Sequence, residues 1–387
     1  MIPALPFSLF ANPRAGTPGM VVLPEGGFRR ARDAIRGWPG YAPTPLVDLP
    51  AVAAGAGVGA VRLKDEAGRF GLGSFKALGG AYAVANLLAN EFSRAGTQPA
   101  DMTVTCATDG NHGRAVAWGA QRLGCRCVIF VHATVSQGRV DAIAAYGAEM
   151  RRVAGTYDNA VREADRVARE QGWFVVADTS WPGYTEVPRD IMQGYRVMAD
   201  EAADQWAKTG TGEAPTHVFI QAGVGGVAAA VSAQMRARYR PVPMLVVVEP
   251  DKAACLLASA ELGTPTAVAG NLDTVMAGLA CGEPSLLAWQ ELERGAAAFM
   301  AVPDEAATAC MRLLADQGIV AGESGVAGLA GFLLAAADPA ARAALGLGPD
   351  SLVLLFSTEG ATDPALYARL VGRTAAEVAT PSPPLLP

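Results

Sequence analysis

The 387-residue sequence is poor in the residues that metal sites and disulfide frameworks need. It has three histidines and six cysteines, and Cys125 and Cys127 have a single residue between them. That spacing does not fit a zinc knuckle, and His112, His132 and His217 form no ligand pair. We therefore expect no metal ion, and cysteines that serve as small buried residues in a reducing cytoplasm.

A basic surface and a long apolar run are also missing. Lys and Arg number 31 against 37 Asp and Glu, which argues against a nucleic-acid partner. The longest apolar stretch, from Ser324 to Ala337, is too short and too rich in Gly and Ala for a membrane span. The first residues do not form a secretory signal. The expectation is a cytoplasmic protein that binds neither nucleic acid nor membrane.

What the sequence does contain is apolar material and an alternating pattern. Hydrophobic residues make up 51% and charged residues 18%, as in enzymes with a large buried core. Short β-branched runs alternate with Ala-rich helical stretches, which is typical of parallel sheets covered by helices. We expect strands at Thr103–Ala107, Cys127–Val131, Glu149–Val153, Phe174–Ala177, His217–Gln221, Leu245–Val248 and Leu352–Phe356, with helices at Gly113–Leu123, Tyr157–Gln171 and Val227–Arg238.

The length favours two domains in an α/β fold, each a mostly parallel sheet covered by helices. No long linker separates two halves, so the two domains must interleave. We expect a large domain of residues 1–80 and 189–387 and a small domain of residues 81–188. The Pro-rich end, residues 379–387, is expected to be a loose tail.

The first chemical motif is GLGSFKALGG, from Gly71 to Gly80. Its glycines mark a turn that enters a helix, with Ser74 as a candidate N-cap and Lys76 in the first turn. There the helix dipole and apolar surroundings would lower the pKa of Lys76, as a Schiff-base nucleophile needs. A surface lysine at a helix start is the alternative.

The second motif is CATDGNHGR, from Cys106 to Arg114, where a strand is followed by a turn and a helix. The N–H groups of such a turn bind anions, and Asn111 adds amide donors. His112 is better explained as a helix-start residue than as a base. The alternative is an ordinary Asp-Gly turn.

The third motif is QAGVGGVAAAV, from Gln221 to Val231. A strand is followed by three glycines and a helix, which is the form of a phosphate cradle. The chain lacks the lysine of a P-loop and the full spacing of a dinucleotide fingerprint, so tight packing of strand on helix stays possible.

The fourth motif is LLFSTEGATDP, from Leu354 to Pro364, a strand that ends in two hydroxyls. Ser357 or Thr358 could bond a neutral aromatic nitrogen. A polar strand end, with Asp363-Pro364 opening a helix, is the alternative.

Taken in this order, the four motifs resemble the pyridoxal-phosphate (PLP) enzymes of the tryptophan-synthase-β fold, or fold type II. The resemblance runs from about Thr44 to Tyr367. Within that family the chain resembles the diaminopropionate ammonia-lyases, whereas serine and threonine dehydratases usually carry other residues at Asp109 and Leu78. The stretches that carry this likeness are GSFKALGGAYA, ATDGNHGR, VADTSWPGYTEVPRDIMQGY, MAGLACGEPS and FSTEGATDP.

The resemblance implies a role for each motif. Lys76 would hold the cofactor as a Schiff base and take the α-proton of the substrate. Asn111 would bond the 3-hydroxyl of the ring, and Ser357 would face the pyridine nitrogen. Backbone N–H groups would hold the phosphate at Gly223, Val224, Gly225 and Gly226, and the substrate carboxylate would lie at Thr108, Asp109, Gly110 and Asn111.

The implied reaction is elimination of ammonia from D- or L-2,3-diaminopropionate, which gives pyruvate and ammonia. Asp109 would be a second base for the other enantiomer, or would pair with the cationic amino group of the substrate. Asp178 is a second carboxylate for that pairing, unless it is a strand-end cap. A serine or threonine dehydratase, a β-replacement synthase and a non-catalytic sensor stay as alternatives. The family also implies a homodimer.

Overall fold

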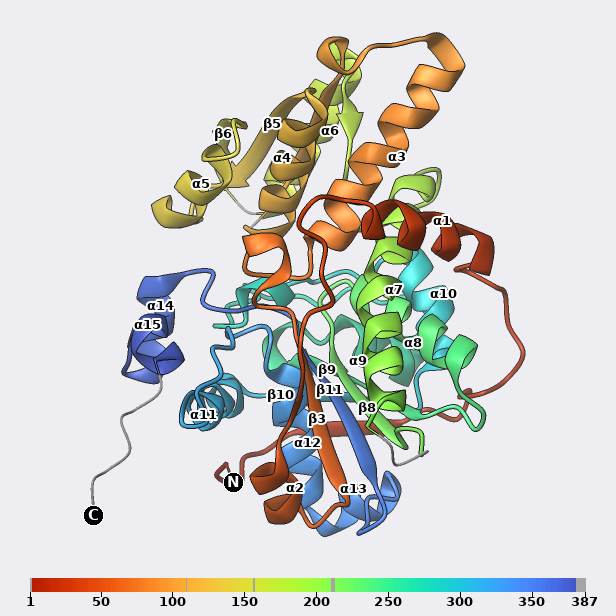
Figure 1. The fold of residues 1–387 in the computed structure, drawn as a ribbon, viewed down its shortest axis with the longest axis vertical. Helices are drawn as coiled ribbons and strands as arrows, with labels where there is room; N and C mark the ends of the chain where they lie inside the picture. Colours follow the sequence, from red (N-terminus) through yellow and green to blue (C-terminus); the bar gives the residue numbers. More distant parts are fainter. Residues whose placement is uncertain (1, 109, 156, 210–212, 381–387) are drawn as a thin grey trace.

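A computed structural model describes residues 2–108, 110–155, 157–209 and 213–380. Their strands form a seven-stranded and a four-stranded sheet, and helices cover both sheets (Figure 1). The predicted fold class is therefore confirmed.

The large sheet is parallel except at its two edges. Its edge strands pair antiparallel with their neighbours, and the inner pairs are all parallel. In spatial order its strands are β1 (Ser8–Ala11), β10 (Ala298–Val302), β9 (Met244–Pro250), β8 (His217–Gln221), β11 (Leu352–Ser357), β3 (Ala60–Asp65) and β2 (Leu46–Asp48).

Successive residues of its inner strands belong to two different cores. Because side chains alternate along a strand, Val218 and Ile220 face one layer of helices while Phe219 faces the other. The first layer contains α1 (Glu25–Arg36), α7 (Glu186–Ala207), α8 (Gly226–Arg238), α9 (Cys255–Leu262) and α10 (Leu286–Gly295). The second contains α2 (Pro50–Ala56), α11 (Asp304–Ala315), α12 (Ala327–Ala337), α13 (Pro339–Ala344), α14 (Pro364–Val371) and α15 (Ala375–Ala379).

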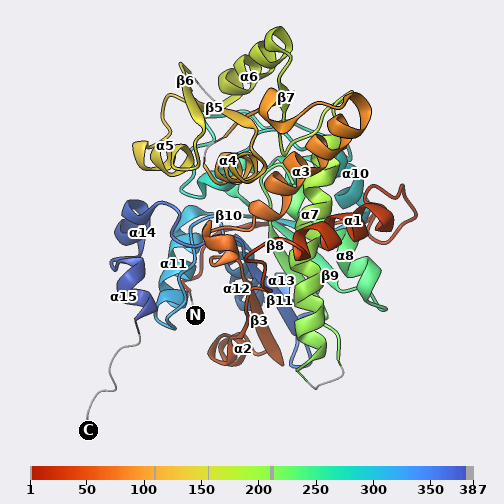
Figure 2. The ribbon, with the colours of Figure 1, turned by 45° about the horizontal axis from the view of Figure 1, so that its top comes forward.

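The small sheet is parallel throughout and is built from one continuous stretch of chain. Its spatial order is β6 (Glu149–Val153), β5 (Arg126–His132), β4 (Thr103–Ala107) and β7 (Phe174–Val175). Its α6 (Tyr157–Gln171) packs on one face, whereas α3 (Ala77–Ala95) and α4 (Asn111–Leu123) pack on the other (Figures 1 and 2). The helix α5 (Gln137–Ala144) joins β5 to β6.

The chain passes from the large sheet to the small one after β3 and returns after β7. The division at residues 80 and 188 stays a prediction. Short one-turn helices complete the chain at Arg69–Gly71, Pro99–Asp101, Asp251–Ala253 and Ala277–Leu279.

Four strands were not predicted: β1, β2, β3 and β10. In β3 the charges of Arg62 and Lys64 interrupt the apolar run that marks a buried parallel strand. The strand β10 follows a run of alanines, which favours a helix. The predicted strand from Phe174 ends at Val175 in the structure.

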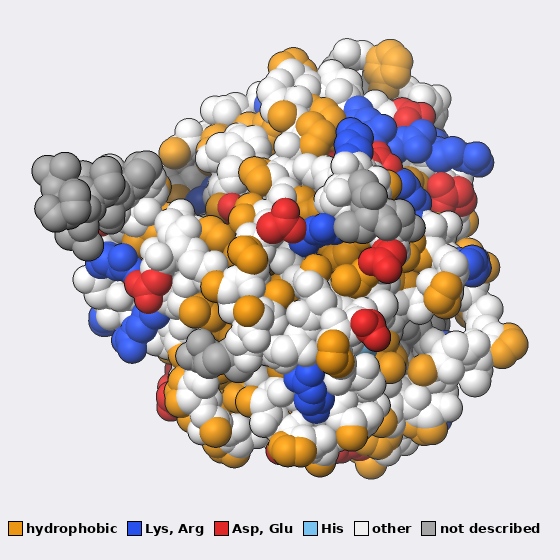
Figure 3. Space-filling model, turned by 60° about the horizontal axis from the view of Figure 1, so that its bottom comes forward, with side chains coloured by type: hydrophobic (Ala, Val, Ile, Leu, Met, Phe, Trp, Pro, Cys, Tyr) orange, Lys and Arg blue, Asp and Glu red, His pale blue; other side chains and the backbone are white. Residues whose placement is uncertain are grey.

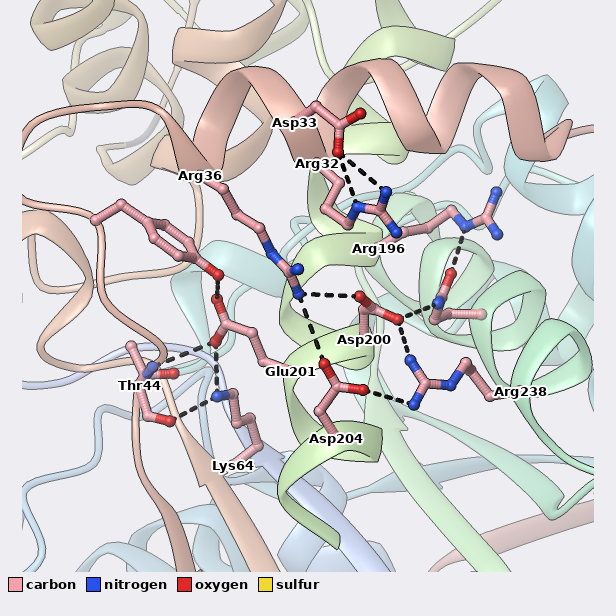
Figure 4. Close-up of polar contacts among 12 residues, drawn as sticks. Arg32, Asp33, Arg36, Thr44, Lys64, Arg196, Asp200, Glu201, Asp204 and Arg238 are labelled. Atoms are coloured by element: carbon pink, nitrogen blue, oxygen red, sulfur yellow. Dashed lines mark hydrogen bonds and ion pairs between the residues drawn. The ribbon is translucent and has the colours of Figure 1, made fainter. Parts of the chain in front are cut away.

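The polar face of α7 explains why the buried charge of Lys64 is tolerated in β3 (Figure 4). Nζ of Lys64 lies 2.7 Å from Oε2 of Glu201, and both side chains are almost fully buried. The backbone N–H of Thr44 donates to the same carboxylate. Arg69 bonds both Glu201 and Glu66, so the segment that leads to Lys76 is tied to α7.

A second group of charges on α7 holds the neighbouring helices. Arg36 of α1 lies 3.3 Å from a carboxylate oxygen of Asp200 and 3.6 Å from one of Asp204. Arg238 of α8 pairs with the same two carboxylates (Figure 4). These pairs fix the rotation of α7 between α1 and α8.

The surface carries both signs of charge. Lys, Arg, Asp and Glu side chains are intermingled on the face drawn in Figure 3. No helix among the described residues has the length and apolar character that crossing a bilayer requires. Among the described residues, the most exposed large apolar side chains are Met20, Val21 and Leu262.

Candidate functional site

A cavity lies where the carboxyl ends of β4, β8 and β11 meet the start of α3. All four sequence motifs reach its wall, although they lie far apart in the chain. Of the predicted site residues, its wall contains Lys76, Thr108, Gly110, Asn111, Asp178, Gly223, Val224, Gly225 and Gly226. Asp109 lies outside the described residues, so its predicted role stays a prediction.

Lys76 forms an ion pair with Asp178 inside this cavity. The lysine precedes the first residue of α3 and no side chain caps that helix, so Ser74 is not the cap that the motif suggested. Burial lowers the pKa of Lys76, but the carboxylate of Asp178, with Tyr195 adding to it, raises that pKa well above its ordinary value. The expected lowered pKa is therefore wrong for this structure, because the sequence did not reveal a carboxylate at contact distance.

Asp178 is ionised in this arrangement. Burial would raise its pKa, but the ammonium of Lys76, which pairs with the carboxylate and donates to it, holds the pKa below its ordinary range. The carboxylate belongs to the segment between β7 and α7, 102 positions from the lysine in sequence. The site therefore contains a carboxylate that is already paired with an alkylammonium group.

His112 lies behind this pair as a neutral imidazole. Its Nε2 atom is 2.7 Å from the carbonyl oxygen of Val176, which can only accept, so Nε2 carries the proton. Burial lowers the pKa of His112. Its Nδ1 atom, 3.7 Å from Asp178, is left without a proton. The residue is the second of α4, as the helix-start reading predicted, and it also lines the cavity.

The hydroxyl of Thr108 holds the backbone at the start of α4. This oxygen accepts hydrogen bonds from the backbone N–H groups of Gly110 and Gly113, both at 3.0 Å. Gly113 approaches so closely that a Cβ there would lie 2.3 Å from Thr108. The side-chain amide of Asn111 donates to Glu359, which joins the small sheet to the large one across the cavity.

In the glycine loop that follows β8, two glycines are closely surrounded by other atoms and the third has room around it. A Cβ on Gly223 would lie 3.0 Å from Sγ of Cys281, and Gly225 has a φ of +99°. A Cβ on Gly226 would meet nothing nearer than 3.7 Å. Gly226 begins α8 and no side chain caps this helix, so its first N–H groups are available to an anion in the cavity.

Ser357 and Thr358 differ in their placement. Ser357 is fully buried at the end of β11, its hydroxyl lies 3.4 Å from the carbonyl oxygen of Glu359, and it is not in the cavity wall. Thr358 and Glu359 are in the wall. The role of Ser357 at the pyridine nitrogen stays a prediction.

Several wall residues were not predicted, among them Arg139, Tyr195, Gln221, Ser324 and Glu359. Gln221 and Glu359 belong to motifs that the sequence did single out, so their position at a strand end was a usable signal. Arg139 and Tyr195 lie within helices, where nothing in the sequence separates them from surface or core residues.

No group of three or more His, Cys, Asp or Glu in the part of the chain that the structure describes is placed to hold a metal ion.

Comparison with known proteins gives a family. The model of the family described as "Pyridoxal-phosphate dependent enzyme" matches residues 37–358. The chain belongs to this family. The site fits the cofactor, because it joins a lysine and open N–H groups at a helix start in one cavity.

Individual members of the PLP-dependent family are similar to this chain over most of its length. The diaminopropionate ammonia-lyase of Escherichia coli strain K12 is 43% identical over 355 residues, which cover 86% of this chain and 88% of that protein. The enzyme of the same name from Salmonella typhimurium is 40% identical, covering 87% and 90%. The predicted resemblance is confirmed.

Solved structures of family members are also similar to this chain. The holo diaminopropionate ammonia-lyase from Escherichia coli has a TM-score of 0.89 at 38% identity, covering 96% of this chain and 98% of that one. The same enzyme has been solved with an aminoacrylate-PLP intermediate, with a TM-score of 0.88 at 38% identity and the same coverage. Threonine deaminase isoform 2 from Solanum lycopersicum, at 20% identity, shows the fold alone.

Proposed function

We propose that this PLP enzyme eliminates ammonia from 2,3-diaminopropionate, in both the D and L forms, and gives pyruvate and ammonia. One observation carries the proposal: an ionised Asp178 pairs with an alkylammonium group, that of Lys76, inside the cofactor cavity. The likeness to the diaminopropionate ammonia-lyases over most of the chain supports the same substrate.

The cofactor supplies an electron sink that acidifies the α-proton of the bound amino acid. Lys76 holds the cofactor and takes that proton. The N–H groups of the loop from Gly223 to Gly226 hold the phosphate, and Asn111 holds the 3-hydroxyl. Loss of the β-amino group leaves 2-aminoacrylate, which hydrolyses to pyruvate and a second ammonia.

Asp178 gives the preference for a diamine. A cation that leaves water needs a counter-charge, and burial makes an unpaired charge costly. While Lys76 is bonded to the cofactor it presents no free ammonium, so Asp178 would pair with the distal ammonium of the substrate. That pairing would leave Lys76, once it is freed, without the carboxylate that raises its pKa, so its amine could take the α-proton. A hydroxyl substrate brings no such charge, which disfavours the serine or threonine dehydratase alternative.

Asp109 is proposed as the second base. In the sequence it stands between Thr108 and Gly110, in the motif to which the resemblance assigns the substrate carboxylate. A base there, in addition to Lys76, would let the site accept both enantiomers. The substrate carboxylate would lie on Thr108, Gly110 and Asn111.

We also propose that the chain forms a homodimer and works in the cytoplasm. The exposed side chains of Met20 and Val21, at 68% and 74%, offer apolar surface for a second copy. Light scattering after gel filtration tests the dimer.

Two experiments test the function. In the first, pyruvate release is measured with a panel of D- and L-β-substituted alanines. Faster release from L-serine or L-threonine than from L-diaminopropionate would assign the chain to the dehydratases.

In the second experiment, Lys76→Ala should abolish the visible absorbance band of bound cofactor. A borohydride-reducible adduct that persists in the same peptide of this variant would contradict the role of Lys76.

A further inference from the structure

Tyr195 places a buried hydroxyl in the wall of the cofactor cavity. Its Oη atom makes no hydrogen bond with any residue that the structure describes. Burying a hydroxyl without a partner costs stability, so such atoms are uncommon in folded proteins. Packing of the fold therefore does not explain why a tyrosine, and not a phenylalanine, stands at this position.

Close contact between α3 and α7 brings this side chain to the start of α3. A Cβ on Gly194 would lie 1.9 Å from the carbonyl oxygen of Leu78, and a Cβ on Gly79 would lie 2.4 Å from Cε1 of Tyr195. The ring of Phe75 packs on that of Tyr195, with the two centroids 4.6 Å apart. The two glycines thus let α7 approach the residues on either side of Lys76.

The lysine has two polar neighbours of different charge. Nζ of Lys76 pairs with the ionised Asp178 and lies 5.7 Å from the centre of the Tyr195 ring. Burial raises the pKa of Tyr195, so its phenol is neutral. Against burial, which lowers it, Asp178 and then Tyr195 raise the pKa of Lys76. Both neighbours therefore favour the ammonium form of the lysine.

Lys76 gains a positive charge when it acts as a base. Under the proposed function, Asp178 is at that moment paired with the distal ammonium of the substrate. The α C–H bond breaks, its proton goes to the amine of Lys76, and its electron pair stays with the substrate. The ammonium that results can only donate hydrogen bonds, and inside a cavity it needs an acceptor. The phenol oxygen of Tyr195 is a neutral acceptor beside it.

We propose that Tyr195 is a positioning residue for Lys76, and that its phenol oxygen accepts a hydrogen bond from the ε-ammonium group that forms as Lys76 takes the α-proton. The inference rests on the proposed function, because it needs Lys76 as the base and Asp178 on the substrate. No proton leaves Tyr195. Because this hydrogen bond strengthens as charge develops on the lysine, it acts on kcat and not on KM.

His112 is the rival acceptor. Its Nδ1 atom also has no hydrogen-bond partner in the part of the chain that the structure describes, and it lies 3.7 Å from Asp178. His112→Gln separates the two residues. The amide of glutamine can still donate to the carbonyl oxygen of Val176, but it has no acceptor atom at the place of Nδ1.

The experiment is steady-state pyruvate release from L-diaminopropionate with hydrogen or deuterium at the α-carbon. Tyr195→Phe keeps the ring and removes only the hydroxyl. We expect a kcat roughly 10- to 100-fold lower with KM unchanged, as for a lost hydrogen bond to a charged group. Deuterium should slow this variant at least as much as it slows the natural chain, because proton transfer becomes the slower step.

Tyr367→Phe is the matched control. Its hydroxyl is also buried and without a partner among the described residues, but Tyr367 is not part of the cavity wall. This variant should keep the natural kcat and the natural effect of deuterium. A loss like that of Tyr195→Phe would show that removal of any buried hydroxyl lowers turnover, and the inference would be overturned.

Two further measurements separate positioning from a structural role. The apoenzyme of Tyr195→Phe should melt no lower than that of the natural chain, because the lost hydroxyl makes no hydrogen bond. Titration with PLP, followed by the visible band, should give an unchanged affinity. A much lower melting temperature or weaker PLP binding would mean that the hydroxyl holds the fold or the cofactor, which contradicts the inference.

If Tyr195→Phe does not fold, 3-fluorotyrosine at position 195 replaces it. This residue keeps the ring and the hydroxyl, but its oxygen is a poorer acceptor, so kcat should fall by a smaller factor. The inference fails if the variant that folds keeps the natural kcat, if its lower kcat is insensitive to α-deuterium, or if His112→Gln shows these effects instead. A natural chain that releases no pyruvate from diaminopropionate would be a failure of the proposed function, which is seen before any variant is made.

Discussion

The ammonium of Lys76 and the carboxylate of Asp178 pair across the cavity, although they belong to two segments that join the large sheet to the small one. The pair raises the pKa of the lysine and lowers that of the acid. Each residue therefore sets the charge of the other, and replacing either should have separable effects on cofactor and substrate.

Asp178→Asn should lower kcat/KM for L-diaminopropionate far more than for L-serine. Removing one partner of a buried charge pair costs about 2 kcal/mol or more, which is roughly 30-fold. Steady-state pyruvate release checks this, with Asp316→Asn as a control whose side chain is 71% exposed. Equal losses on the two substrates would mean that Asp178 acts only through Lys76.

Asp109→Asn should reduce activity on D-diaminopropionate much more than on the L isomer. The reason is that Lys76 can serve one face of the substrate without it. Initial rates on the separate enantiomers measure the effect, and Asp316→Asn, at a side chain that is 71% exposed, is a suitable control. If both enantiomers lose equally, the two-base proposal fails while the family assignment stands.

Gly226→Ala and Gly225→Ala form a matched pair on the phosphate loop. A Cβ on Gly226 has room within the protein, so this variant should melt like the natural chain but bind PLP at least tenfold more weakly. Gly225 has a φ of +99°, and a Cβ there would lie 2.9 Å from Ala288, so this variant should lose stability. Melting of the apoenzyme and PLP titration check both, and normal PLP affinity in Gly226→Ala would contradict the cradle.

Glu201→Ala should destabilise the protein by about 3–5 kcal/mol, because it leaves Lys64 and Arg69 buried without their shared carboxylate. Arg36→Ala, at a side chain that is 39% exposed, should cost less than about 1 kcal/mol. Urea unfolding of the two variants gives the comparison. Similar losses of stability in the two variants would show that burial of the ion pairs does not determine their contribution to the free energy of unfolding.

Glu323→Gln should flatten the dependence of stability on pH. Burial, and then the nearby charge of Glu359, raise the pKa of Glu323 from 4.5 to about 8. The unfolded chain loses this proton near pH 4.5 and the folded chain near pH 8, so the folded state binds more protons between them.

Stability should therefore fall as pH rises through this window, by an amount on the order of a few kcal/mol. Glutamine has no proton to lose and still offers an oxygen to Arg139, which lies 3.2 Å from Glu323. Urea unfolding at pH 5.5 and 8.5 provides the test. If stability depends on pH with the same slope in the natural chain and in Glu323→Gln, the raised pKa of Glu323 is refuted.

Much of the fold was predictable because inner strands carry apolar runs, as in Leu352–Phe356. Edge strands such as β2 have only three residues, and β3 contains Lys64, whose charge is satisfied by a helix more than a hundred residues away. A local pattern cannot contain that information. The same reason hid the pairing of Lys76 with Asp178, whereas the glycine loop was visible because its need for bare backbone is local.

The chain crosses between its two sheets once in each direction, and each crossing carries one member of the Lys76–Asp178 pair. The ion pair therefore restrains the two sheets relative to each other. Bonding Lys76 to the cofactor would remove its ammonium and with it this restraint. An enzyme with bound cofactor should thus allow more relative motion of the two sheets when a substrate enters.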